Sequence, residues 1–409
     1  MRLYRLLPPL GVACGLIAAF VLRSRPPRTV IHQGPTIVID TDADHSHNPA
    51  YNRPTIEMAF VLDTTGSMTG LIDAAKQKIW CIINSVMKSP VHPRLKVGLV
   101  AYRDHGDVYI TKVLQMTDDL DKVYSALMQY RAEGGGDRPE DVRQAMSDAV
   151  HKVGWSRCAP GLAQLMFLVG DSPPHDDYQN EPDCLTSSAE ALQQGIIVNA
   201  IECGNAEDTK LIWQQIARRG QGQFMAIAQD GGIHEISTPY DKDLSVLGRT
   251  IGGTYVAYGG SNSGVGRGGG TTYRSAMTRS KAGFEDGLVG AAPAAALADR
   301  AYNKAINGEA YDGDLLLDVE NGKVQIDKLA KDDLPDDLQK LNPETLKTEV
   351  LHRIMERKAL KQKIMDLSRK REDYITEARR KTSGADADGF DAVVTAAIKT
   401  EAATKGVAL

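Results

Sequence analysis

A regular alternation of strand-like and helix-like segments from Thr55 to Ile251 constrains the fold more than any other feature. An apolar run at Ile56–Leu62 is followed by helical spacing at Met68–Met87 and by a second strand at Leu95–Tyr102. Leu162–Val169 is an almost continuous apolar run, as expected of a strand in a sheet that is covered on both faces. The alternation predicts an α/β domain with a doubly wound, mostly parallel sheet.

The remaining segments of this region continue the pattern. Val108–Val113 follows its neighbour too closely for a helical crossover, so we expect it to be an antiparallel strand. Helices are predicted at residues 118–130, 137–153, 189–194 and 208–218, and strands at residues 196–201 and 224–228. The sequence therefore predicts one α/β domain over residues 55–251.

The overall composition is that of a globular chain. Its 409 residues are 42% hydrophobic and 25% charged, which excludes a wholly disordered or collagen-like chain. The formal net charge of −5 and the 6% of aromatic residues offer neither a basic face nor stacking platforms for bases. We therefore expect no nucleic-acid partner.

Residues 1–28 have the composition of a membrane-targeting segment. Two arginines precede an uncharged stretch, Leu6–Leu22, and three arginines follow it. At about 1.5 Å per helical residue, this stretch is near the lower limit for a membrane span. We expect a signal anchor; a cleaved signal peptide and a lipoprotein signal ending at Cys14 are the alternatives.

The side of the membrane on which the chain lies is left open by two opposing signals. The arginines after the uncharged stretch favour the cytoplasm. Of the five cysteines, removing Cys14 leaves an even number, which suits an oxidising compartment with three pairings: Cys81, Cys158, Cys184 and Cys203. Free thiols are the alternative. We expect the bulk of the chain to be membrane-anchored and extracytoplasmic or extracellular.

Two linkers and a polar tail flank the predicted domain. Residues 29–54 lack periodicity and indicate a solvated linker, and the glycine-rich residues 259–271 indicate a flexible one. The tail at residues 272–409 is polar and helix-rich, with a hairpin predicted at 314–327 around Asn321-Gly322. A long helix is predicted at 342–381, where Leu360, Ile364 and Leu367 form a short coiled-coil-like seam that Arg371 breaks. We expect this helix to be either solvated or self-associating.

The residues that carry chemistry lie where the first strand ends, in Asp63-Thr64-Thr65-Gly66-Ser67. Residues spaced by two in extended backbone point the same way, so Asp63, Thr65 and Ser67 direct three oxygens at one point. In an open α/β sheet, ligands bind outside the carboxyl ends of the strands. Carboxylate and hydroxyl oxygens suit Mg²⁺ best, with Ca²⁺ or Mn²⁺ as alternatives.

Two further loops carry acids to the same edge of the predicted sheet. A glycine loop at Gly134–Gly136 leads into Asp137 and Glu140, and Asp171 directly follows a buried strand. Each acid alone also fits a helix cap or a turn. Together, on three loops, they indicate a cation site that retains water ligands.

At this point the chain resembles the von Willebrand factor type A domain family over residues 54–250. Phe60–Met68 looks like that family's metal-ion-dependent adhesion site, with Thr65 in place of the usual Ser. The Gly-Gly-Gly-Asp-x-Pro-Glu stretch resembles the domains of hemicentin-like extracellular proteins and of von Willebrand-type alpha-kinases. It is also similar to integrin β subunits, which implies that Glu140 is a better metal ligand than Asp137. Asp171 matches the family's fourth-strand Asp.

This resemblance implies a metal-dependent adhesion or scaffold module rather than an enzyme. The Mg²⁺ ion would keep an open position, which a carboxylate of a protein partner would complete. No catalytic residue is expected, and residues 252–409 lack the motifs of a kinase. The alternatives are an intracellular adaptor for an ATPase complex and a metal-assisted hydrolase in which His175 would be the base.

Overall fold

The computed structural model describes residues 53–178, 180–227, 236–259, 292–307, 313–382 and 389–409. The predicted anchor at residues 1–28, nearly all of both predicted linkers and parts of the tail lie outside these ranges. Within them, no helix is both long enough and apolar enough to cross a bilayer. All of the described residues belong to one compact unit, Pro49–Leu409.

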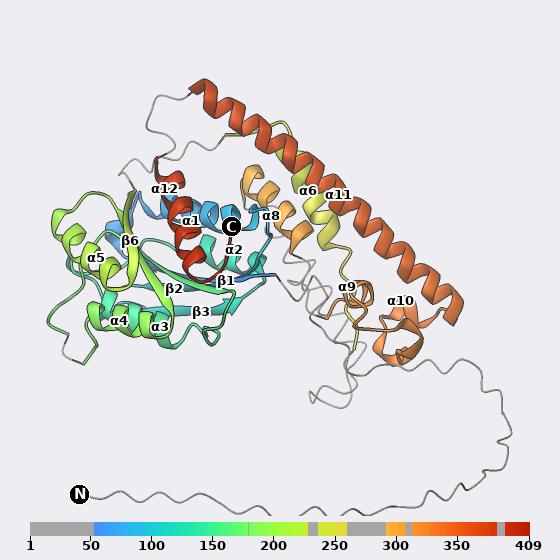
Figure 1. Cartoon of the computed structure of the whole chain (residues 1–409), viewed down its shortest axis with the longest axis horizontal. Coiled ribbons are helices and arrows are strands. Elements are labelled where there is room, and N and C mark those ends of the chain that lie inside the picture. Colours follow the sequence, from blue (N-terminus) through green and yellow to red (C-terminus); the bar gives the residue numbers. More distant parts are fainter. Residues whose placement is uncertain (1–52, 179, 228–235, 260–291, 308–312, 383–388) are drawn as a thin grey trace, which may run out of the picture. The chain divides into compact units, whose positions relative to one another are not determined.

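The predicted α/β fold is confirmed. A six-stranded sheet has the order β3-β2-β1-β4-β5-β6 (Figure 1). All neighbouring strands are parallel except β2 and β3. The strands are β1 (Thr55–Asp63), β2 (Arg94–Tyr102), β3 (Thr111–Thr117), β4 (Leu162–Gly170), β5 (Ile196–Cys203) and β6 (Gln221–Ile227).

Helices cover both faces of this sheet. One face packs against α1 and α2, and the other packs against α3, α4 and α5. Alternate residues of β1 enter the two cores: Phe60 points to the first, and Val61 to the second. The strand is therefore mostly apolar, because neither face meets water. Its buried Glu57 is an exception, and the carboxylate accepts from the backbone N–H of Ser156 at 2.9 Å and from Gln164 at 3.0 Å. The helices of this domain are α1 (Ile72–Met87), α2 (Leu120–Gln129), α3 (Val142–His151), α4 (Cys184–Gln193), α5 (Glu207–Arg219) and α6 (Asp241–Gly252).

Several predicted element boundaries within the domain are wrong; helix α4, for example, begins at Cys184 rather than at residue 189. The antiparallel strand runs over Thr111–Thr117 rather than Val108–Val113, and Val108 is 91% exposed. Helix α3 begins at Val142 rather than at Asp137, because Glu140 pairs with Pro174 in an isolated bridge. Asp141 then caps the helix, with its carboxylate accepting from the backbone of Gln144 at 2.8 Å.

The C-terminal region is helical and packs against the domain. Its helices are α8 (Ala294–Ile306), α9 (Leu315–Glu320), α10 (Asp336–Gln339), α11 (Pro343–Thr382) and α12 (Gly389–Thr404). Helix α12 contributes Val394, Ile398 and Ala402 to the same core cluster as β1 and α1. The last helix of the chain is therefore part of the layer that covers the sheet.

The predicted hairpin at residues 314–327 is wrong, because α9 occupies its first half. Asp314 caps this helix by accepting from the backbone N–H of Leu316 at 2.9 Å. Asn321 ends the helix, and Gly322 follows with a φ of 72°. The Asn-Gly pair thus ends a helix and does not form a hairpin turn. Both features place a glycine in the left-handed region, so the sequence pattern alone does not distinguish them.

The predicted long helix is confirmed as α11, but its apolar seam is covered within the chain. Ile364 is fully buried in a cluster with residues of α6 and α8, and Leu360 and Leu367 pack against that cluster. Arg371, on the same helix, is bound by Asp241 at 2.7 Å and Asp299 at 3.0 Å. The face predicted for self-association is therefore occupied by helices of the same chain.

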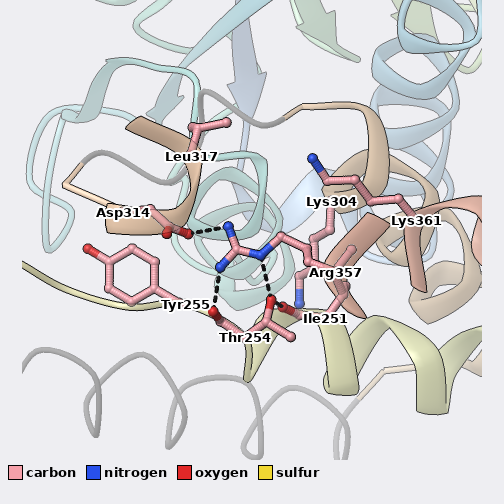
Figure 2. Close-up of a pocket in the computed structure, with 8 residues that line it drawn as sticks. All are labelled: Ile251, Thr254, Tyr255, Lys304, Asp314, Leu317, Arg357 and Lys361. Carbon is pink, nitrogen blue, oxygen red and sulfur yellow. Dashed lines mark hydrogen bonds and ion pairs between the residues drawn. The ribbon is translucent and has the colours of Figure 1, made fainter. Parts of the chain in front are cut away.

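A second buried arginine of α11 binds the segment that follows α6. The Arg357 guanidinium binds Asp314 at 2.7 Å and donates to the side chain of Thr254 at 2.9 Å (Figure 2). It also donates to the carbonyl oxygen of Thr254. The cavity beside it measures about 10 Å³, room for a single water rather than for a ligand. Figure 2 therefore shows a structural ion pair.

Burial of Glu401 on α12 predicts a pH-dependent stability. One carboxylate oxygen accepts from Asn199 at 2.9 Å, and burial raises the pKa of Glu401 to about 7. A raised carboxyl pKa stabilises the fold below the unfolded pKa of 4.5, and this contribution is lost as the pH rises through 7. The free energy of unfolding of Glu401→Gln should equal that of wild type at pH 4.5 and exceed it by about 3 kcal/mol at pH 8.

Urea unfolding of both proteins at several pH values measures this difference. Other carboxyl groups titrate equally in the two proteins and cancel in the comparison. A difference in the free energy of unfolding that does not grow between pH 4.5 and pH 8 would contradict a buried, shifted Glu401.

Candidate metal centre

The predicted site lies at the point where the order of the strands reverses. From β1 the chain continues to β2 on one side, while β4 pairs with β1 on the other side. Asp63 is the last residue of β1, and Asp171 directly follows β4. These two acids therefore emerge side by side at the carboxyl edge of the sheet, where α/β proteins bind ligands.

A chain of short polar contacts joins the residues after β1 to Asp171. One carboxylate oxygen of Asp63, Oδ1, accepts from the backbone N–H of Thr65 at 2.8 Å and from its hydroxyl at 2.7 Å. The hydroxyl oxygens of Thr65 and Ser67 lie 3.1 Å apart. Ser67 donates to Asp171 Oδ1 at 2.7 Å. The structure thus brings together the oxygens of Asp63, Thr65, Ser67 and Asp171.

Glu140 joins this group from the glycine loop. Its side chain is 1% exposed and lies close enough to Asp63 for the two charges to interact. The backbone N–H of Glu140 donates to the carbonyl oxygen of Pro173 at 3.0 Å, which ties this loop to the loop after β4. Glu140 is therefore fixed beside the strand ends by backbone pairing.

Asp137 does not join this group. Its side chain is 66% exposed and lies 3.8 Å from the Nε2 atom of His175. His175 also faces Asp104, at 3.5 Å. Of the six residues predicted for the site, the structure thus brings five together and places Asp137 in a separate cluster.

Two glycines allow the loops to approach this closely. A side chain at Gly170 would place its Cβ atom 2.7 Å from the Cβ atom of Asp63. At Gly135, φ is 72°, and a Cβ atom would lie 2.8 Å from a carboxylate oxygen of Glu140. Neither position tolerates a larger residue without displacing an acid of the site.

The crowding of these acids shifts their protonation. Burial, followed by the negative charge of Asp171, raises the pKa of Asp63 to about 7. Burial and the charge of Asp63 raise the pKa of Glu140 to about 9, although a hydrogen bond with Thr65 opposes the shift. Each carboxylate therefore destabilises the charge of the next, and a nearby cation would relieve this repulsion.

The residues of the site fit a hard divalent cation. Asp63 Oδ2 and Glu140 Oε2 are buried, and neither makes a hydrogen bond within the described part of the chain. Such atoms are costly unless something pairs with them. Carboxylate and hydroxyl oxygens are ligands that Mg²⁺ accepts. The donor set, with its two unpartnered oxygens, fits the chemistry of such a cation.

Three residues that support the site carry no signal in the sequence pattern. Tyr102 ends β2, and its buried hydroxyl, near Asp63, has a pKa raised well above the usual value by burial and the surrounding acids. Asp107 accepts from the backbone of Gly135 at 2.8 Å and holds the glycine loop in place. Thr209 donates to the carbonyl oxygen of Asp171 at 3.1 Å. Only the folded loops bring them to the site.

The domain is similar to a known protein family. Residues 57–237 match a family model described as the von Willebrand factor A domain. The human von Willebrand factor A domain-containing protein 7 is 33% identical over 143 residues, 34% of this chain and 14% of that protein. The rat protein of the same name is 33% identical over 141 residues. The matched part thus spans about a seventh of these relatives.

Two solved structures are also similar to part of the chain. The pilus adhesin SpaC from Lactobacillus rhamnosus GG, in an open conformation, is 16% identical with a TM-score of 0.35. That similarity covers 44% of this chain and 29% of the adhesin. The SpRpn10 VWA domain is 16% identical with a TM-score of 0.33, covering 43% of this chain and 89% of that domain.

Proposed function

We propose that the von Willebrand factor A domain of this chain binds a protein partner through a divalent cation held at the carboxyl edge of its sheet. Such domains generally bind proteins. The observation that carries the proposal is the convergence of three carboxylates with two unpartnered buried oxygens, beside two hydroxyls. We assign Asp63, Thr65, Ser67, Glu140 and Asp171 as the residues that hold the ion.

The chemistry of these residues favours Mg²⁺, with Ca²⁺ or Mn²⁺ as alternatives. Bound there, the ion would supply positive charge to a carboxylate of the partner. Ser67 is exposed and Asp171 is half-buried, so the site is open to solvent on the side where a partner would approach. Asp137 is not assigned as a ligand, because its side chain faces His175.

We propose binding without covalent chemistry. The hydroxyl of Ser172 donates to Asp171 at 3.0 Å, whereas His175 contacts Asp177 at 2.9 Å through Nδ1. A serine nucleophile would need a base within hydrogen-bond reach. Ser172 and His175 instead contact different acids, which supports binding rather than hydrolysis through a serine–histidine pair.

Capture experiments with and without a chelator test this function. Immobilised full-length chain should retain a partner from an extracellular or cell-surface protein fraction in Mg²⁺ and release it in EDTA. Asp63→Ala should retain none, whereas Asp73→Ala, the same substitution at an acid that is 81% exposed on α1, should behave as wild type. A partner retained equally by wild type in EDTA and by Asp63→Ala would contradict metal-dependent binding.

We also propose that residues 1–28 anchor the domain in a membrane, outside the cytoplasm. The support is the uncharged stretch Leu6–Leu22 between arginines. A reporter fused to the C-terminus should be active only in the extracytoplasmic compartment. Activity in the cytoplasm would instead favour an intracellular adaptor for an ATPase complex.

A further inference from the structure

A second cluster of metal-type ligands lies beside the proposed cation site. His175 Nε2 is 3.5 Å from Asp104 Oδ2 and 3.8 Å from Asp137 Oδ1. One ligand atom from each of the three residues lies within 4.8 Å of the other two. Asp104 follows β2, Asp137 precedes α3 and His175 follows β4, so three separate loops supply the cluster.

The imidazole of His175 is the informative member. The residue is 7% exposed, and its Nε2 atom is buried without a hydrogen-bond partner in the described structure. Its other nitrogen, Nδ1, is 2.9 Å from Asp177 Oδ1. A carboxylate at one ring nitrogen fixes the tautomer that leaves the other nitrogen free to bind a metal. The ring also stacks on Tyr178, with centroids 4.2 Å apart, which holds its orientation.

The spacing suits a small ion with nitrogen and oxygen ligands. In a tetrahedral site with bonds of about 2.0–2.1 Å, donor atoms lie about 3.3 Å apart. The two distances from His175 Nε2, 3.5 and 3.8 Å, are close to that value. Asp104 is 5% exposed and further held by the hydroxyl of Tyr178 at 2.7 Å. Asp137, at 66% exposure, leaves the solvent side open for a fourth ligand.

We propose that His175, Asp104 and Asp137 bind a divalent transition-metal ion such as Zn²⁺. A histidine nitrogen distinguishes this cluster from the all-oxygen set around Asp63, since imidazole favours Zn²⁺ over Mg²⁺. This inference does not depend on the proposed cation at Asp63. A metal held here would also restrain Glu140, because the backbone N–H of His175 donates to the carbonyl oxygen of Glu140 at 3.1 Å.

Calorimetric titration of the full-length, metal-stripped chain with Zn²⁺ tests the site. Wild type should bind Zn²⁺, and His175→Gln should weaken that binding at least tenfold. Asp137→Asn should do the same without a change in folding, since its side chain is mostly exposed. Asp177→Asn, which removes the carboxylate at Nδ1, should weaken binding about 10- to 100-fold.

Two control variants separate this site from its neighbours. His151 lies on α3 at a side-chain exposure of 51%, so His151→Gln changes an imidazole outside the cluster. Asp63→Ala removes a central residue of the proposed Mg²⁺ site. Both should keep the wild-type affinity for Zn²⁺. No Zn²⁺ binding by wild type, or undiminished binding by both His175→Gln and Asp137→Asn, would overturn the proposal and leave an ion-paired structural histidine.

Discussion

Mg²⁺ should stabilise the wild-type chain against unfolding and should leave the stability of Asp63→Ala unchanged. An ion that binds only the folded state adds about 2.7 kcal/mol to the free energy of unfolding at roughly 100 times its Kd. Asp63 is fully buried at the centre of the acid group, so its loss removes a ligand that no neighbouring residue replaces. Thermal unfolding of both proteins, in EDTA and across a Mg²⁺ titration, measures the effect.

Two further variants make this result specific. Asp63→Asn removes the charge but keeps the shape, so it too should lose the response to Mg²⁺. In EDTA it should unfold no more easily than wild type, because one of several repelling carboxylates is gone. Asp73→Ala, on the exposed face of α1, should keep the full response. An equal gain from Mg²⁺ in wild type and in both Asp63 variants would contradict the assigned site.

Loss of Arg357 should strongly destabilise the protein. Arg357→Leu leaves the carboxylate of Asp314, which is 1% exposed, without its cation. Breaking one partner from a buried ion pair costs about 3–5 kcal/mol. The same change also leaves the hydroxyl and carbonyl oxygens of Thr254 without the guanidinium donor that they have in wild type. Urea unfolding of the full-length protein should therefore show a clearly lower midpoint.

The same helix supplies a matched control. Arg353 lies one turn earlier on α11, where it pairs with Glu349 and Asp337 at a side-chain exposure of 29%. Arg353→Leu should cost about 1 kcal/mol or less, because partly solvated pairs contribute little. Adding Asp314→Asn to Arg357→Leu should restore part of the stability by removing the buried charge. Equal losses in the free energy of unfolding for Arg353→Leu and Arg357→Leu would contradict a stabilising buried ion pair at Arg357.

The α/β core could be predicted because its signals are local. Residues 56–62 and 162–169 are apolar except for Glu57 and Gln164, and both segments are confirmed as central strands with helices on either face. The antiparallel partner of β2 was predicted from a short connection alone, but its boundaries depended on the register of pairing. Helix α12 was missed as core, because Val394, Ile398 and Ala402 acquire their burial only by packing on the sheet.

The site could be predicted in part for the same reason. Asp63, Thr65 and Ser67 lie within one short segment, whose extended backbone directs their side chains to one side. Asp137 and Glu140 lie three residues apart in one loop, so their spacing alone could not decide which of them reaches the strand ends, although the family resemblance favoured Glu140. The bridge between Glu140 and Pro174 decides it, by fixing the backbone next to β4.

The sequence by itself determined the sheet, its order of strand and helix, and the segment that ends β1, since hydrophobic periodicity and turn chemistry are properties of neighbouring residues. Only the tertiary structure decided which acids share a site. Asp104, Asp137 and His175 come from three loops and show no ligand spacing along the chain. Their proximity, like the burial of Arg357 and α12, arises from packing between segments far apart in sequence, which no local pattern records.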